Sequence, residues 1–306
     1  MITRIKRLLS APEYWYQPRQ LIRRAGGRAL GEVVEVRLIW GLPMEVELDR
    51  MIGVDVFNRG VFERSIPEMI SRLLDEGEVA VDVGAHVGQN ASAMAIAAGG
   101  GGRVIAVEAH PEIFEFLNRN VARWERYEGL ARVEAISCAL SAEAGTGYLR
   151  EFDGFELNSG TSTLEGGGIG EKVSHEVKVG TLDELLAGEE RGIGVLKLDV
   201  EGHEGAVLAG ASGLLARDRI RDILYEQLGD DVGGVHERLR EAGYELFSIF
   251  PGVMRVALGS WDERRGGSRA INYLATRDGD RVRTRLAKAG WQCLRRGMGR
   301  RVRAKR

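Results

Sequence analysis

The residues best suited to chemistry in this chain follow an apolar run, residues 79–83. Asp82 lies near the end of this run, and Gly84 and Gly88 come before a stretch with helical character. A strand that leads through a glycine turn into a helix is where doubly wound sheets bind nucleotide-like cofactors. A dinucleotide fingerprint would need a second glycine where His86 stands, so that fingerprint is excluded. The alternative is an ordinary strand–turn–helix without a ligand.

A second acid belongs to the same unit. Residues 103–107 form another apolar strand, and Glu108 ends it. In nucleotide-binding sheets an acid at this place accepts hydrogen bonds from ribose hydroxyls. The intervening helix should run from about residue 88 to residue 98 and stop at four glycines. Asp82 and Glu108 are therefore expected at neighbouring strand ends, although Glu108 could also be a solvated strand-end acid or a helix N-cap.

Another polar cluster follows the apolar residues 193–198. Side chains alternate along a strand, so Lys197, Asp199 and Glu201 should share one face. A buried Lys197 would need a carboxylate partner. His203 follows at the start of the next helix, beside the strand ends where ligands bind in such sheets.

The first cluster resembles the first motif of class I S-adenosylmethionine-dependent methyltransferases. Residues 197–204 resemble the signature of the FkbM-family methyltransferases, and the resemblance covers about residues 65–276. Two positions depart from the family pattern: His86 stands where Asn is usual, and Ala109 where Pro is usual. The resemblance implies an α/β fold of the class I methyltransferase (Rossmann-like) type. Its sheet has seven mostly parallel strands with helices on both faces.

The resemblance also implies the cofactor, S-adenosyl-L-methionine, with Asp82 facing its amino acid end. The positions that it assigns to cofactor binding are Asp82, Gly84, Ala85, His86, Gly88, Asn90, Glu108, Ala109 and Ala139.

The implied reaction is O-methylation of a hydroxyl on a sugar, glycolipid or natural product. A hydroxyl acceptor needs a general base, and the candidates are Asp199, Glu201, His203 and Glu226. The residues do not decide among these four, and His203 could simply begin a helix. Three carboxylates could also hold Mg²⁺, but acids at strand ends are often only hydrogen-bonded, so no metal ligand is assigned.

Two other functions remain open. An RNA 2′-O-methyltransferase would share the chemistry, and a scaffold protein could bind the cofactor without turnover. Methyltransferases that act on nitrogen usually carry Asn/Asp-Pro-Pro-Tyr/Phe after the fourth strand, whereas residues 199–202 read Asp-Val-Glu-Gly. The acidic central part of the chain argues against nucleic acid as a partner, and the expected partner is a small-molecule, glycan or glycolipid acceptor.

Three regions are expected along the chain: an extension over residues 1–64 with helical and β elements, the methyltransferase domain over 65–277, and a basic amphipathic tail over 278–306. Residues 31–60 alternate like a small antiparallel β element, and Ser65 with Glu68 forms a capping-box pattern. The Gly-rich residues 153–171 are expected to form a mobile lid over the acceptor.

The chain carries a net charge of −2, but residues 281–306 contain eleven Lys and Arg and no acid. An apolar stripe of Val282, Leu286, Ala289 and Cys293 makes this tail an amphipathic helix, which could contact an anionic membrane or pack on the acidic body. The two cysteines lack metal-site spacing, and no apolar stretch is long enough to span a bilayer. The expected location is therefore cytoplasmic, with peripheral contact at the inner membrane surface as an option.

Overall fold

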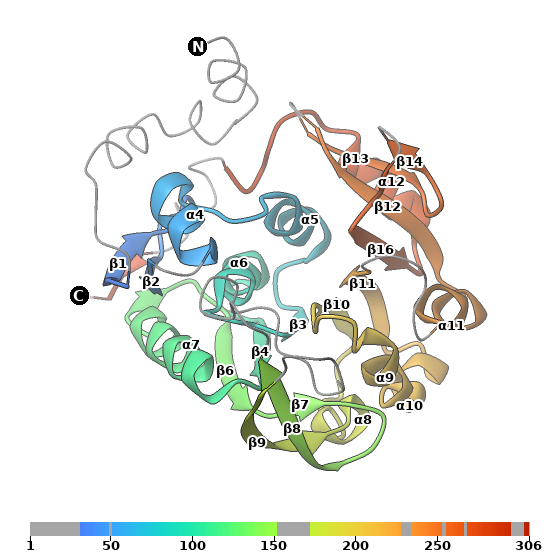
Figure 1. The fold of residues 1–306 in the computed structure, drawn as a ribbon. Coiled ribbons are helices and arrows are strands. Elements are labelled where there is room, and N and C mark those ends of the chain that lie inside the picture. The colour runs from blue at the N-terminus through green and yellow to red at the C-terminus, as the bar shows by residue number, and fades with distance from the viewer. Residues whose placement is uncertain are drawn as a thin grey trace.

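A central sheet of eight strands organises the molecule (Figure 1). The computed structural model describes residues 31–48, 51–151, 172–227, 234–252, 255–265, 268–294 and 303–305. In spatial order the strands are β13 (Val256–Ser260), β12 (Glu245–Pro251), β16 (Asn272–Thr276), β11 (Ile220–Glu226), β10 (Ile193–Leu198), β3 (Val79–Val83), β4 (Arg103–Glu108) and β6 (Arg132–Ser137).

The strands from β11 to β6 run parallel, while β16 is antiparallel to both of its neighbours. The predicted class of fold is confirmed, but the predicted number of strands was one too low. The additional strand, β13, pairs antiparallel with β12 and extends the edge of the sheet. Because β3, β4, β10 and β11 are parallel neighbours, the polar residues that follow them meet at one edge.

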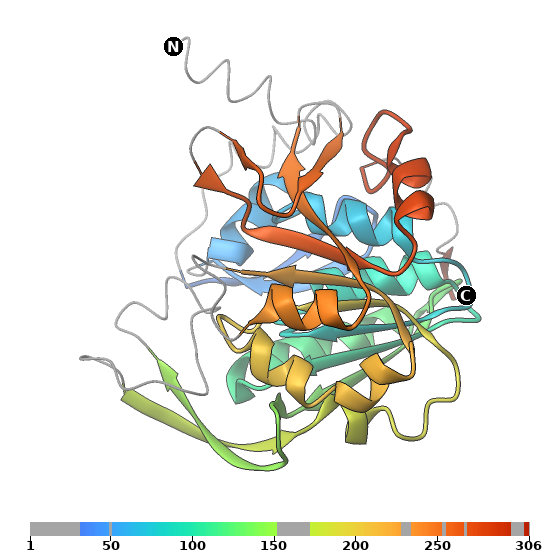
Figure 2. The same ribbon diagram turned by 90° about the vertical axis from the view of Figure 1, so that its right-hand side faces the viewer.

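Helices cover both faces of the sheet (Figure 2). One face carries α5 (Ser65–Leu73), α6 (Gln89–Ala98) and α7 (Pro111–Trp124), and the other carries α8 (Leu182–Leu185), α9 (Glu204–Ala209), α10 (Ser212–Ala216) and α11 (Val235–Glu241). Side chains alternate along β3, so Ala80 belongs to the first core and Val79 and Val81 belong to the second. Burial on both faces explains why these strands are continuous apolar runs.

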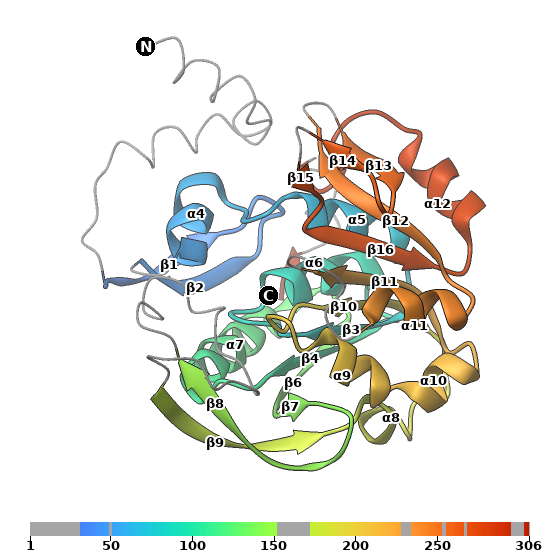
Figure 3. The ribbon, with the colours of Figure 1, turned by 45° about the vertical axis from the view of Figure 1, so that its right-hand side comes forward.

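The N-terminal segment is part of the first core. An antiparallel hairpin of β1 (Val33–Arg37) and β2 (Pro43–Glu47) lies against α7, and α4 (Met51–Arg59) follows it (Figure 3). The predicted β element is therefore correct for the hairpin and wrong for α4. Trp40 is buried, and its Nε1 donates a hydrogen bond to Ser92 Oγ at 3.0 Å.

The predicted capping box of α5 is absent, although a capping box forms at α8. Helix α5 begins after Arg64, and Ser65 is its first residue rather than its cap. Glu68 instead binds Arg72 at 2.6 Å and accepts the Cys293 backbone N–H at 2.8 Å, so tertiary contacts replace the local box. At α8, Thr181 and Glu184 form a capping box.

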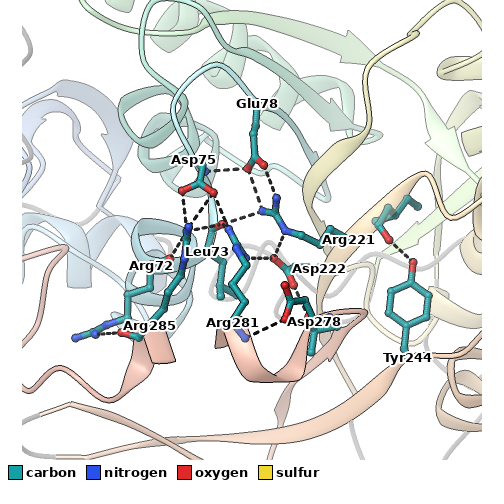
Figure 4. Close-up of polar contacts among 12 residues, drawn as sticks. Arg72, Leu73, Asp75, Glu78, Arg221, Asp222, Tyr244, Asp278, Arg281 and Arg285 are labelled. Atoms are coloured by element: carbon teal, nitrogen blue, oxygen red, sulfur yellow. Dashed lines mark hydrogen bonds and ion pairs between the residues drawn. The ribbon is translucent and has the colours of Figure 1, made fainter. Parts of the chain in front are cut away.

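The C-terminal segment packs on the body. Helix α12 (Gly279–Leu286) ends earlier than the predicted amphipathic helix. Its apolar residues and the chain beyond it are nevertheless buried: Val282, Leu286, Trp291, Cys293 and Leu294. Figure 4 shows how its arginines attach it: Arg281 binds Asp75 at 2.9 Å and Asp222 at 3.0 Å, and Arg285 binds Asp75 at 2.7 Å. Val282, Leu286 and Cys293 of the predicted stripe thus face the protein, whereas Ala289 is exposed.

Smaller elements complete the fold. A three-stranded sheet is formed by β7 (Ala139–Leu140), β9 (Lys172–Gly180) and β8 (Gly145–Glu151), and short pairs join β14 (Arg264–Arg265) to β15 (Ser268–Arg269) and β17 (Arg303–Ala304) to β5 (Tyr127–Glu128). The predicted lid, residues 153–171, lies outside the described residues. Within the described ranges, no helix has both the length and the apolar character that crossing a bilayer requires.

Candidate active site

The glycine turn after β3 is attached to β4 and to the loop after β10. The backbone N–H groups of Gly84 and Ala85 donate to Val107 O at 3.0 and 2.9 Å. Gly84 has φ +73°, and a Cβ there would lie 1.8 Å from the carbonyl oxygen of Asp199. Gly88 has φ +94°, and a Cβ there would lie 2.8 Å from Leu117 Cδ1. Only glycine fits at both positions, because either side chain would collide with packed neighbours.

Lys197 links the two polar clusters. Its Nζ lies 3.4 Å from Asp82 Oδ1, 3.1 Å from Asp199 Oδ2 and 3.3 Å from Gly84 O. Burial opposes the charge on Lys197, but Asp199 and Asp82 raise the pKa of its ammonium group. Lys197, for which one carboxylate partner was expected, therefore has two. Asp82 is 0% exposed, so its carboxyl group is buried beneath the turn. Burial raises the pKa of Asp82, and the charge of Lys197 opposes this shift.

Glu108 connects the loop after β3 to the loop after β4. Its Oε2 accepts the His86 N–H at 2.8 Å, and its Oε1 accepts the His110 N–H at 2.9 Å. Burial raises the pKa of this carboxyl group. Each carboxylate oxygen has a second lone pair, so Glu108 can still accept hydrogen bonds from a ribose.

The acids after β10 and β11 differ in protonation. Burial would raise the pKa of Asp199, but Lys197 and a hydrogen bond with Glu226 hold it below its usual range. Burial and the Asp199 charge raise the pKa of Glu226, so Glu226 keeps the proton of this pair. Burial, with Asp199 and Glu204 close by, raises the pKa of Glu201 to about 7.

The turn that carries Glu201 is shaped by Glu204. Glu204 Oε1 accepts the Val200 N–H at 3.0 Å and the Gly202 N–H at 3.4 Å. Glu201 has φ +53°, a left-handed conformation that costs a non-glycine residue energy. The neighbouring loop therefore holds Glu201 in a specific orientation.

The remaining predicted residues lie around this centre. His203 precedes α9, and its Nε2 lies 3.0 Å from Ser141 Oγ, at the edge of the small β7–β9 sheet. Ala109 and Ala139 belong to one small apolar cluster with Leu149 and Val177, so they shape a wall and offer no polar group. No group of three or more His, Cys, Asp or Glu in the described ranges is arranged to hold a metal ion.

Two residues of the site were missed by the sequence analysis, Glu63 and Asn272. Glu63 lies between α4 and α5, and the Asn272 side chain at the start of β16 is among the groups that lower its pKa. Burial and the Asp199 charge raise the pKa of Glu63. Both residues are far in sequence from the recognised motifs, and no local pattern marks either of them.

The fold and the two strand-end clusters define a class I methyltransferase site, and comparison with known proteins agrees. The profile of the methyltransferase FkbM domain matches residues 82–246. The chain therefore belongs to the FkbM methyltransferase family and is an S-adenosylmethionine-dependent methyltransferase. No curated protein matches the sequence.

Several solved structures are similar to this chain. The methyltransferase FkbM from Methylobacillus flagellatus KT is 13% identical over 73% of this chain and 52% of that chain, with a TM-score of 0.42. Aeropyrum pernix fibrillarin with bound S-adenosyl-L-methionine is 14% identical over 83% and 86%, with a TM-score of 0.38. An S-adenosylmethionine-dependent O-methyltransferase from Thermotoga maritima is 15% identical over 81% and 78%, with a TM-score of 0.36.

The residues present fit S-adenosylmethionine. Asn90 Oδ1 is buried at the start of α6 and has no hydrogen-bond partner among the described residues, so it can accept from a ligand amino group. Glu108 supplies free lone pairs at the next strand end, and the Gly84–Ala85 backbone is hydrogen-bonded to Val107, the residue before it. These residues would hold the cofactor, which supplies an electrophilic methyl group when bound.

Proposed function

We propose that the protein is an O-methyltransferase for a hydroxyl group of a sugar, glycolipid or natural product. The observation that carries this proposal is Glu201, a strand-end acid whose pKa of about 7 suits a general base at neutral pH. A hydroxyl is a poor nucleophile until its proton is removed as the bond to the methyl group forms.

The neighbouring acids Glu226 and Asp199 support this assignment, because each is a poorer proton acceptor than Glu201. Glu226 keeps its proton near neutral pH and is hydrogen-bonded to Asp199, so it is a poor proton acceptor. Asp199 is ionised but is neutralised by Lys197 at 3.1 Å, and its lowered pKa makes it a weak base. We assign Asp199 to orientation of the acceptor and His203, paired with Ser141, to positioning of the turn.

The acidic surroundings of Glu201 also favour some acceptors over others. Asp199, Glu204 and Glu63 act on Glu201 as negative charges, and Lys197 opposes them in part. Such a field repels phosphates, which favours a neutral polyol over RNA as the acceptor. The proposal includes a cytoplasmic location, which is supported by two free, buried cysteines, Cys138 and Cys293.

Transfer of labelled methyl groups tests the proposal. The purified protein is incubated with methyl-labelled S-adenosylmethionine and separate glycan, glycolipid, metabolite and RNA fractions of the source cell. We expect label in a glycan, glycolipid or metabolite fraction that resists mild alkali, because ethers survive treatment that releases methyl esters as methanol. Transfer to RNA alone would establish an RNA 2′-O-methyltransferase instead. Cofactor binding without transfer to any fraction would support the hypothesis of a scaffold protein.

A further inference from the structure

A surface groove lies between the β1–β2 hairpin and α7, which pack against each other (Figure 1). Its volume is about 490 Å³. The residues that line it include Glu35, Pro43, Arg119, Arg123, Arg126 and Tyr127. Helix α7 begins shortly after Glu108 and is 14 residues long, so Arg126, beyond its last residue, lies about 20 Å from the candidate active site. The groove is therefore a separate place on the molecule.

Buried hydrogen bonds fix the two long walls of the groove relative to each other. Asn120 is 0% exposed, and its Oδ1 accepts the Glu45 N–H at 2.7 Å. Its Nδ2 donates to Glu45 O at 3.0 Å and to Val87 O at 2.9 Å. Trp124 Nε1 donates to Pro43 O at 2.8 Å. A ligand would thus meet a preformed groove and would not have to order its walls.

The end of the groove is held by the C-terminal strand. Tyr127 of β5 pairs with Ala304 of β17, and Lys305 N donates to Arg126 O at 2.7 Å. The half-buried Tyr127 side chain adds an aromatic surface to a lining that is otherwise rich in arginine.

The groove carries an excess of positive charge. Arg119 Nε lies 2.7 Å from Glu45 Oε1, and Arg123 is paired with the other oxygen of Glu45. Arg123 Nε also lies 3.4 Å from Glu35 Oε2. Arg126 is exposed and forms no ion pair with any residue that the structure describes. Two acids thus face three arginines, and one positive charge is left over.

Helix stability explains only part of this arrangement. A cation in the last turn of a helix interacts favourably with the helix dipole, which accounts for Arg123. Arg126 follows the end of the helix and has no such partner. A guanidinium group beside a fixed groove is suited to phosphate, because its planar donors match two phosphate oxygens at once.

The acids around the groove favour a small ligand over a membrane. Glu125 and Glu128 are exposed beside Arg126 and Tyr127 in the chain, and the Glu35 side chain is 62% exposed. An anionic membrane surface would be repelled by these charges, whereas a small molecule can enter between them.

We propose that this groove binds a soluble phosphate ester. Its phosphate group pairs with Arg126 and Arg123, and its apolar or aromatic part lies on Tyr127. Arg126 contributes the larger share of the binding, because Arg123 is already paired with Glu45 and Glu35. At about 20 Å from the strand-end acids, the ligand is distinct from the cofactor and from the methyl acceptor.

Calorimetry with three small probes tests the proposal. The full-length protein is first saturated with S-adenosylhomocysteine, so that the probes cannot enter the cofactor site. Phenyl phosphate should bind at millimolar concentrations, inorganic phosphate should bind more weakly, and phenol should give no measurable binding. Added salt should weaken the binding of phenyl phosphate, because the groove is open to solvent.

Two variants separate the parts of the site, and a third is the control. Arg126→Gln should lower the affinity for phenyl phosphate about three- to tenfold, without loss of stability because Arg126 has no ion pair to lose. Tyr127→Ala should reduce that affinity to the value for inorganic phosphate. Arg238→Gln should change nothing. Arg238 is also exposed, lies in the last turn of α11 and has no ion pair among the described residues.

Several results would overturn the proposal. They are no binding of phenyl phosphate, equal affinity in Arg126→Gln and the wild type, or an equal loss in Arg238→Gln. Displacement of S-adenosylhomocysteine by phenyl phosphate would place the probe in the cofactor site instead. Sedimentation with phosphatidylglycerol vesicles that depends on Arg126, without binding of phenyl phosphate, would exclude a soluble ligand. None of these measurements needs a methyl acceptor, so they decide the proposal independently of the proposed function.

Discussion

The α-carbon of Gly84 lies so close to Asp199 that a Cβ on it would be 1.8 Å from the Asp199 carbonyl oxygen. The glycine turn that we expect to bind the cofactor and the loop that carries the acids therefore touch through their backbones. Asp199 N also donates to Val83 O at 3.1 Å, one residue before the glycine. In the proposed reaction, the separation of methyl donor and base would be set by these two adjoining strands.

Gly84→Ala should destabilise the protein by about 3 kcal/mol or more, because the new methyl group meets a backbone oxygen and the residue has positive φ. Binding of S-adenosylhomocysteine should be lost with it. Denaturant unfolding and calorimetry measure the two effects. Gly100→Ala is the control, since nothing lies within 4 Å of a Cβ there. Equal stability of the two variants would contradict the close contact.

Lys197→Met should cost about 3–5 kcal/mol, because it leaves the buried Asp82 and the neighbouring Asp199 without their common cation. Adding Asp82→Asn to Lys197→Met should recover part of the loss, since it removes one of the two uncompensated charges. Urea unfolding of the single and double variants checks this. A double variant no more stable than Lys197→Met would argue against the ion pair as the cause.

Glu201→Gln should lower the rate of methyl transfer by on the order of 10²–10⁴-fold, as loss of a general base does. Cofactor affinity should change little, because the proposed function assigns Glu201 to the acceptor and not to the cofactor. In the wild-type protein the rate should rise with pH through about 7, as Glu201 loses its proton. Full activity of the variant would transfer the role of base to Asp199, His203 or Glu226.

The same group makes a prediction about stability. Because the pKa of Glu201 is raised in the folded state from 4.5 to about 7, the folded state binds its proton more tightly than the unfolded state. Its contribution to stability should therefore fall as pH rises through this window. Glu201→Gln should be more stable than the wild type at pH 8, with a smaller difference at pH 5. Thermal unfolding at the two pH values measures this, and a less stable variant at pH 8 would refute it.

Truncation after Asp280 should destabilise the protein by about 3 kcal/mol or more, because Arg281, Arg285 and the buried residues Trp291 and Leu294 are lost. Truncation after Leu294 keeps these contacts and should cost much less. The intact protein should not sediment with anionic liposomes, since its apolar stripe is buried. Sedimentation that depends on residues 281–294 would instead support the membrane-binding alternative.

Asp75 should make this attachment sensitive to acid. Burial opposes its ionisation, but Arg285 and Arg281 lower its pKa from 3.8. Its contribution to stability is full above about pH 4 and is lost as pH falls through the lowered value. Asp75→Asn should lose about 1 kcal/mol at pH 6, since the side chain is partly exposed, and show a weaker acid dependence. Asp280→Asn, whose side chain is fully exposed, is the control for unfolding between pH 6 and pH 3.

The amino-acid sequence was enough to predict the parallel strands and the acids that end them. Strands such as β3 and β10 are buried on both faces, so a run of consecutive apolar residues is enough to predict them. Parallel order then brings Asp82, Glu108 and Asp199 to one edge, as predicted. A local sequence pattern failed where tertiary contacts compete with it. The capping box at Ser65 does not form, because Glu68 is engaged by Arg72 and Cys293.

Tertiary packing sets how the acids share protons and which distant segments join them. The difference between Glu201, Glu226 and Asp199 arises from burial and from Lys197, and neither acts through sequence spacing. Glu63 and the tail reach their places through long-range packing. Such contacts depend on complementary surfaces formed by the whole chain, which no local pattern encodes.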